Sequence, residues 1–299
     1  MEKIGIITDE AADLPREIIE KYKITIIPVK LDWPDIENLP GENTFQKMRE
    51  LERRGIKSFG KTSQPSPKDF IDKYKEQLEK FENVICITLT SKHSGTFNSA
   101  IQGKNFLSPE EQKRVFVIDS LHASASQALL VLKTVDLIES KKEAKDIVKE
   151  LEEFRSKIKL FAMFQDPKWL EASGRISSLV GNLLRNLVSR GIRAMLTFRK
   201  GKLTPGGIKI HATDTVSVLF KQFDKENQKP KDENKKIRVV ITHGDDFASA
   251  KRLDVSDNVF SVKLAKKIPM AYIIIGILGV AVIAIAFIII RKKIVKKSK

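Results

Sequence analysis

The hydrophobic positions of the first 158 residues form short apolar runs that alternate with amphipathic segments. The apolar runs at residues 4–8, 24–31, 84–88 and 115–119 predict strands. The segments between and after them predict helices over residues 14–22, 44–54, 67–80, 98–106, 124–140 and 143–158. Strands that alternate with helices at this spacing indicate a mostly parallel sheet with helices on both faces, so residues 1–158 are predicted to form an α/β domain.

The pattern continues, with more glycine and proline turns, through residues 159–262. It predicts short strands at residues 159–165, 192–198, 201–205, 207–211, 237–242 and 259–264. Helices are expected at residues 167–172, 179–187, 213–223 and 247–253. We therefore expect a second, smaller α/β domain over residues 159–262.

The last 37 residues differ in pattern from the rest. Residues 268–290 are 23 positions without a charge, and lysine and arginine flank them on both sides. At 1.5 Å per residue a helix of this length crosses a hydrocarbon core of about 30 Å, so residues 263–299 are predicted to hold one transmembrane helix (268–290) and a basic tail. A buried core helix is the alternative.

The first residues of the chain do not resemble a secretory signal peptide. Its first apolar stretch, residues 4–7, is too short for a secretory signal. We therefore expect a single-pass membrane protein whose globular region is cytoplasmic. The single cysteine, Cys86, excludes an internal disulfide and a cysteine-pair zinc site, and a free thiol suits a reducing compartment.

The net charge of +16 is unevenly distributed along the chain. Nine positive charges and no acid lie from residue 263 onward, so residues 1–262 carry only +7. Much of the excess is therefore charge beside the apolar segment, and nucleic acid is not an expected partner.

Two hydroxyl-rich loops stand where ligands bind in parallel α/β sheets. Thr62 and Ser63 precede the helix predicted from residue 67, and Ser94 and Thr96 follow the predicted strand at 84–88. Both loops lead into helix N-termini, where free N–H groups favour a carboxylate or a phosphate. Taken singly, each loop is more typical of a helix cap or a tight turn than of a binding site.

A series of short motifs, in order along about 250 residues, resembles the DegV family of fatty-acid-binding proteins. The motifs are TDEAADLP (8–15), TSQPSP (62–67), SGTFNSA (94–100), VIDS (117–120), LEASGRI (170–176), GKL (201–203) and VITH (240–243). The resemblance implies two α/β domains with a ligand tunnel between them. It also implies a bound long-chain fatty acid whose carboxylate is held by Thr62 and Ser94, with Ser63 and Thr96 nearby.

The resemblance further implies a carrier that makes and breaks no bonds itself. In this family some members present the fatty acid to a separate kinase, which forms an acyl phosphate, and Arg175 is the candidate for facing the kinase or phosphate. No catalytic residue, metal or cofactor is expected. A hydrolase is disfavoured because the sequence has no GxSxG motif and no evident Ser-His-Asp order.

The C-terminus departs from the family pattern. Family members usually end with a histidine-containing HxGPG-type segment that helps bind the head group, and this sequence has none. His243 belongs to the preceding predicted strand and is not assigned that role. A membrane-anchored interaction module of DegV-like fold that has lost lipid binding is therefore the alternative function.

Overall fold

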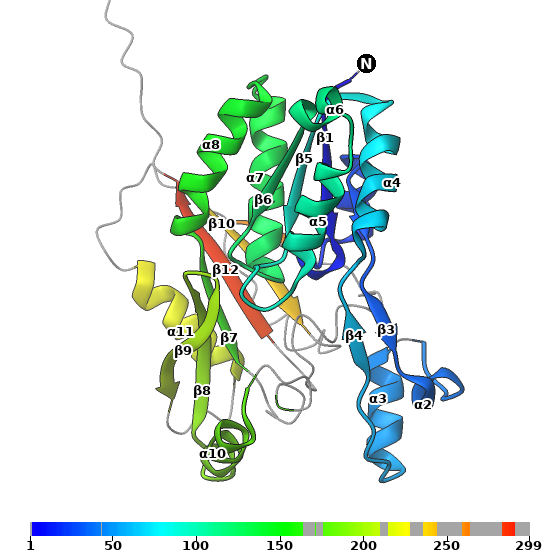
Figure 1. Ribbon diagram of the computed structural model, residues 1–299. Helices are drawn as coiled ribbons and strands as arrows, with labels where there is room; N and C mark the ends of the chain where they lie inside the picture. Colours follow the sequence, from blue (N-terminus) through cyan, green and yellow to red (C-terminus); the bar gives the residue numbers. More distant parts are fainter. Residues whose placement is uncertain are drawn as a thin grey trace, which may run out of the picture.

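A computed structural model describes residues 2–42, 44–163, 171, 176–209, 215–227, 236–243, 259–263 and 283–290. Its secondary structure is α/β throughout (Figure 1). The strands are β1 Glu2–Asp9, β2 Thr25–Ile27, β3 Lys30–Asp32, β4 Lys61–Ser63, β5 Phe81–Thr88, β6 Val115–Asp119, β7 Lys159–Met163, β8 Arg193–Arg199, β9 Lys202–Lys209, β10 Lys236–His243, β11 Val259–Lys263 and β12 Ile283–Ile290. The helices are η1 Glu10–Ala12, α1 Arg16–Lys21, α2 Pro34–Glu37, α3 Thr44–Arg53, α4 Pro67–Leu78, α5 Thr96–Asn105, α6 Pro109–Arg114, α7 Ala125–Glu139, α8 Ala144–Phe154, η2 Arg155–Lys157, α10 Ser178–Ser189 and α11 Thr215–Asn227.

The first sheet has four parallel strands in the order β2-β1-β5-β6. Helices cover both of its faces, so its strands are apolar on both sides rather than alternating with polar residues. In β5, Ile85 and Ile87 pack with α7 and α8, whereas Val84 and Cys86 pack on the other face with residues of α4 and α5. Burial raises the pKa of the Cys86 thiol to about 12, so this cysteine behaves as a small hydrophobic residue.

Helix α7 lies between the two sheets. Nearly every residue from Ala125 to Leu137 is buried, and the helix is apolar around most of its circumference, as expected for a helix packed on more than one side. One hydrophobic cluster joins α7 to strands of both sheets, including Leu160 of β7 and Val240 of β10. At the far end of α7, the Asp136 carboxylate accepts two hydrogen bonds from the Arg238 guanidinium, at 2.8 and 3.0 Å.

The second sheet has six strands in the order β11-β10-β12-β7-β8-β9, and only the β10–β11 pair is parallel. The two short strands predicted at 201–205 and 207–211 are one strand, β9, which pairs with β8 in a hairpin. A register shift between Met195 and Leu196 lets β9 accommodate Pro205 and its following glycines within the hairpin.

The prediction of a transmembrane helix is wrong for the part of it that the structure describes. Residues 283–290 form strand β12, which pairs antiparallel with β10 on one side and β7 on the other. The run of β-branched isoleucines suits a strand, and insertion between two strands satisfies its backbone N–H and C=O groups. Residues 264–282 and 291–299 lie outside the described residues, and within the described ones no helix is long and apolar enough to cross a membrane.

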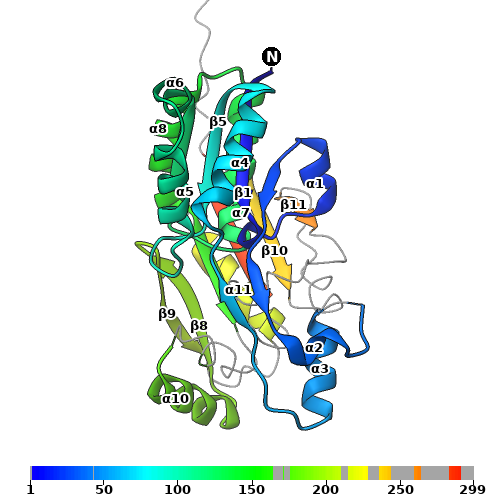
Figure 2. The same ribbon diagram turned by 45° about the vertical axis from the view of Figure 1, so that its right-hand side comes forward.

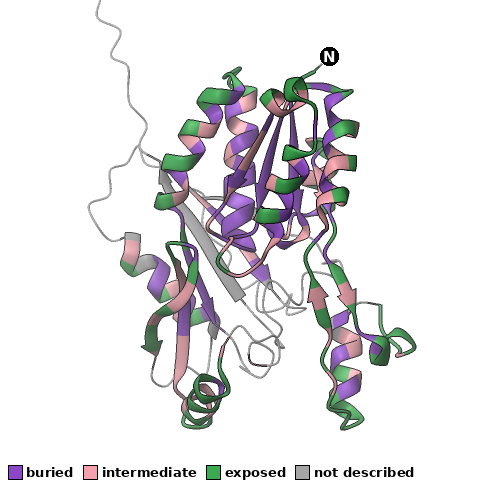
Figure 3. Cartoon of the chain, in the orientation of Figure 1, coloured by how far each residue is buried: buried purple, intermediate pink, exposed green. Residues whose placement is uncertain are grey.

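A small arm projects from the first sheet, built from β3, α2, α3 and β4 (Figures 1 and 2). The single strand predicted at 24–31 breaks at Pro28 into β2, which joins the first sheet, and β3, which pairs with β4. The arm has its own small core of Trp33, Ile36, Met48 and Leu51. Buried residues fill the first sheet, whereas the ends of the arm and α10 are largely exposed (Figure 3).

Candidate functional site

The two hydroxyl loops predicted from the sequence come from different parts of the fold. Thr62 lies in β4 of the arm, opposite Leu31 of β3, and Ser63 beside it is exposed. Ser94 and Thr96 follow β5 of the first sheet, at the start of α5. The prediction that Thr62 lies in a loop is therefore wrong, since three residues of this segment pair with β3.

Gln64 connects the end of β4 to the Ser94 loop. It directly follows β4, and its Nε2 atom lies 3.3 Å from the hydroxyl of Ser99 in α5. The same amide lies across Gly95: a Cβ atom built on Gly95 would stand only 2.1 Å from Gln64 Oε1. The arm segment that carries Thr62 therefore reaches the N-terminus of α5 through a contact that a glycine permits.

The Ser94 loop is organised for binding by neutral donors. The Ser94 and Thr96 hydroxyls lie 2.8 Å apart, and Ser94 Oγ also accepts a hydrogen bond from the backbone N–H of Thr96 at 3.2 Å. Gly95, the N-cap of α5, offers no side-chain cap, and the helix is ten residues long. The positive end of the helix dipole and two hydroxyl groups therefore lie together at the N-terminus of α5, an arrangement suited to a carboxylate or a phosphate.

The buried polar residues behind this loop were not singled out as a cluster by the sequence analysis. Asp9, at the end of β1, accepts hydrogen bonds from the backbone N–H groups of Leu89 and Ala11 and from Gln127 of α7. Burial raises the pKa of Asp9 to about 6, against the opposing effect of these bonds. The acidic residues of the TDEAADLP motif were the only sign of this cluster in the sequence. Their surroundings depend on α7, which is distant in sequence.

Asp13 extends this buried cluster toward the second sheet. Ser124 donates a hydrogen bond to Asp13, and the Ser124 hydroxyl lies 3.0 Å from that of Thr242 in β10. Burial raises the pKa of Asp13 to about 8. Among the described residues, no group of three or more His, Cys, Asp or Glu side chains is placed to hold a metal ion.

The hairpin β8–β9 also reaches the Ser94 loop. Thr90 donates from Oγ1 to the carbonyl oxygen of Gly201 at 2.8 Å, and the backbone N–H of Leu203 donates to His93 Nε2 at 2.8 Å. Gly201 has a φ of +81°, and a side chain there would meet Thr90. The GKL motif therefore forms a close contact between the hairpin and the loop after β5, and His93 lies in that contact.

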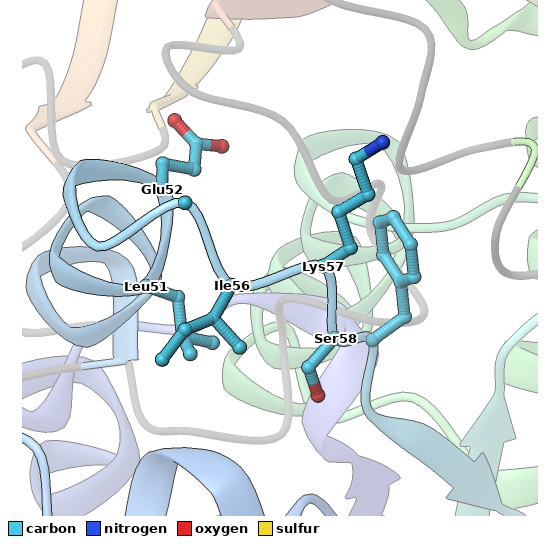
Figure 4. A pocket seen from close by; sticks show the side chains of 7 residues that line it. Leu51, Glu52, Ile56, Lys57 and Ser58 are labelled. Atoms are coloured by element: carbon cyan, nitrogen blue, oxygen red, sulfur yellow. The ribbon is translucent and has the colours of Figure 1, made fainter.

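Arg175, the predicted kinase-facing residue, lies outside the described residues. A pocket of about 350 Å³ opens at the tip of the arm, lined by Leu51, Glu52, Gly55, Ile56, Lys57, Ser58 and Phe59 (Figure 4). It includes none of the predicted binding residues, and the interdomain tunnel stays a prediction.

Comparisons with known proteins agree with the motifs. The chain is 34% identical over 268 residues to a DegV domain-containing protein from Clostridium perfringens, covering 88% of this chain and 92% of that protein. It is 32% identical over 261 residues to a fatty acid-binding protein from Thermotoga maritima, covering 84% and 85%. A crystal structure of a stearic acid-binding protein from Eubacterium ventriosum superposes with a TM-score of 0.75 at 25% identity, over 97% of this chain and 98% of that one.

The family assignment rests on nearly the whole chain. The family model described as an uncharacterised protein of the DegV family matches residues 3–289, a range that reaches from β1 into β12. The α/β fold is that of the solved structures of this family. The chain belongs to the DegV family.

Proposed function

We propose that this protein binds one long-chain fatty acid, with Thr62 and Ser94 as the main ligands of the carboxylate and with Ser63 and Thr96 beside them. The observation that carries the proposal is the contact between the end of β4 and the Ser94 loop: Gln64 brings the segment after Thr62 against Gly95, next to the paired hydroxyls of Ser94 and Thr96. The fatty acid-binding relative from Thermotoga maritima and the stearic acid-binding structure support the choice of ligand.

The energetics of such a site divide between the two ends of the ligand. Each buried methylene contributes about 0.8 kcal/mol, so a chain of some fourteen methylenes supplies most of the binding free energy before ordering costs are subtracted. Each hydrogen bond to the carboxylate contributes about 1.5–3 kcal/mol. The acyl chain therefore provides affinity, and the hydroxyls fix the position of the head group.

The role is that of a carrier. A relative and a solved structure from Thermotoga maritima are described as binding fatty acid, in agreement with the prediction of a binding protein. We extend the proposal to presentation of the bound acid to a separate ATP-dependent kinase, with Arg175 facing that partner. Formation of acyl phosphate from this chain, a kinase and ATP, lost in Arg175→Ala with fatty-acid binding intact, would test the extension.

The direct test is native mass spectrometry of the full chain, followed by identification of the extracted lipid. The full chain is needed because β12 is part of the second sheet. One fatty acid per chain in the wild type, and much less in the Thr62→Ala/Ser94→Ala variant, is the expected result. A wild type that is empty and takes up no added fatty acid would favour the alternative, an interaction module of DegV fold without a lipid.

The proposal does not include a membrane-spanning helix over residues 268–290, because residues 283–290 form a strand. Association with a membrane and a cytoplasmic location of the globular region stay predictions. Fractionation of cells that express the full chain, with protease protection of residues 1–262, would test both.

A further inference from the structure

The loop that carries Ser94 is held from the second sheet as well as from the arm. Two hydrogen bonds connect it to the β8–β9 hairpin: one from Thr90 to the Gly201 carbonyl oxygen, and one from the Leu203 N–H to His93 Nε2, both 2.8 Å long. Thr90 is fully buried and His93 is half-buried. The bond to His93 is one residue from Ser94, so it bears directly on the orientation of that hydroxyl.

The imidazole of His93 is also fixed by ring packing. Phe198 of β8 lies edge-to-face against His93, with ring centroids 6.0 Å apart, and against His122, at 5.9 Å. Because His93 Nε2 accepts a hydrogen bond, that nitrogen carries a lone pair and the ring is neutral. The contact with the hairpin therefore requires the neutral form of this side chain.

We propose that His93 is a positioning residue for the head-group site, which fastens the β8–β9 hairpin to the Ser94 loop only while its imidazole is neutral. The proposal rests on the assignment of Ser94 as a carboxylate ligand. Protonation places an N–H on Nε2 against the N–H of Leu203, so it breaks the hydrogen bond and loosens the hairpin. Protonation of His93 on acidification then weakens binding of the fatty-acid carboxylate.

The charged and titratable residues of the elements that meet at this contact are Lys92 in the loop, Arg199, Lys200 and Lys202 in the hairpin, and Asp119 at the end of β6. His122 packs against the same Phe198 ring as His93, and Arg155 donates to the carbonyl oxygen of Asp119. The Asp119 carboxylate accepts from the backbone N–H groups of Ser91 and Leu121, at 3.2 and 3.0 Å. The buried carboxyls of Asp9 and Asp13 have pKa values of about 6 and about 8, so a variant that changes His93 alone is needed to isolate its contribution.

The experiment measures binding of palmitate to the full chain between pH 5.5 and pH 8. His93→Phe keeps a ring against Phe198 but removes the acceptor, and His93→Gln keeps an acceptor that does not titrate. Lys202→Ala, an exposed change beside Leu203, is the matched control. We expect wild type, His93→Gln and the control to agree within about twofold at pH 8, and His93→Phe to bind about fivefold more weakly, as for the loss of one hydrogen bond.

The pH profile separates positioning from simple packing. On acidification, the palmitate affinities of the wild type and of Lys202→Ala should fall about fivefold relative to that of His93→Gln. They should then approach the affinity of His93→Phe. Equal binding of His93→Phe and wild type at pH 8, or one shared pH profile for all variants, would overturn the proposal.

A second measurement keeps this test distinct from that of the proposed function. Hydrogen exchange at residues 199–204 should be faster in His93→Phe than in wild type at pH 8, and unchanged in Lys202→Ala. A wild type that binds no palmitate would refute the proposed function, and with it the effect on binding. Unchanged exchange in His93→Phe would refute the hairpin contact whether or not palmitate binds.

Discussion

The two halves of the candidate head-group site, at Ser94 and at Thr62, lie in very different structural surroundings. Ser94 follows a central strand of the first sheet, above the buried carboxyl of Asp9 and beside the β8–β9 hairpin. Thr62 lies in a three-residue strand of an arm whose core consists of four buried residues. The Ser94 half therefore contacts the first sheet and the β8–β9 hairpin, whereas the position of Thr62 depends on the pairing of β4 with β3 in the arm.

The largest effect is expected from removal of core side chains in each half. Ile87→Ala in β5 should lower the free energy of unfolding by about 2–5 kcal/mol, because it leaves a cavity in the main core. Met48→Ala in the arm should instead speed hydrogen exchange mainly between residues 31 and 63. Urea denaturation and hydrogen exchange check both, and equal shifts of the global midpoint would show that the arm and the first sheet unfold as one unit.

The buried acids behind Ser94 should make stability depend on pH. Because the pKa of Asp13 is raised to about 8, the folded protein binds more protons than the unfolded chain between about pH 4 and pH 8. Stability is therefore expected to fall as pH rises through this range, by about 2 kcal/mol between pH 6 and pH 8.

Asp13→Asn should flatten the upper part of that profile, since the amide keeps an acceptor for Ser124 without titrating. Thermal unfolding at a series of pH values measures the effect. A wild-type stability that rises between pH 6 and pH 8 would contradict the assignment of a protonated Asp13.

Removal of a single hydroxyl group from Ser94 or from Thr62 compares the two residues as ligands of the carboxylate. Ser94→Ala and Thr62→Ala each remove a hydrogen bond to a charged carboxylate, worth about 1.5–3 kcal/mol, and each should weaken palmitate binding at least tenfold. Calorimetric titration with palmitate and with the matching neutral alcohol tests this, because the loss should be smaller for the alcohol. The same loss for both ligands would mean that the hydroxyls do not contact the carboxylate.

The smallest effect is expected at the contact between the halves. Gly95→Ala should displace the Gln64 amide and weaken binding a few-fold, with little change in stability, because the φ of Gly95 is −78° and the displaced group is the end of a flexible side chain. The Gln64→Ala/Gly95→Ala variant removes the clash, so the difference between the two variants measures what the Gln64 contact contributes. No effect of Gly95→Ala on binding would show that Gln64 does not set the spacing of the loops.

Local patterns predicted much of the fold. The strand at Val115–Asp119 has the bounds that its apolar run predicts, and helix α4 begins at Pro67 after the Ser66 cap. Ser66 forms a capping box with Asp69, an interaction between residues three apart in sequence. Such features were predictable because the residues that determine them are neighbours along the chain.

Other features were missed because distant segments decide them. The triplet Lys61–Ser63 becomes a strand only because β3 offers it a partner. The apolar run at 283–290 has the composition of a membrane helix, yet it becomes β12 because β10 and β7 leave a place between them in the second sheet.

The sequence by itself determined the α/β elements, the hydroxyl motifs and the family. Local periodicity, helix caps and short ordered motifs are properties of adjacent residues, so they are visible without a structure. Only the tertiary structure decided that Gln64 lies against Gly95 and Ser99, that His93 accepts from Leu203, and that Ser124 donates to Asp13. Each of these depends on groups far apart in the sequence, and burial and hydrogen-bond partners at such separation follow from how the sheets, the arm and α7 pack together.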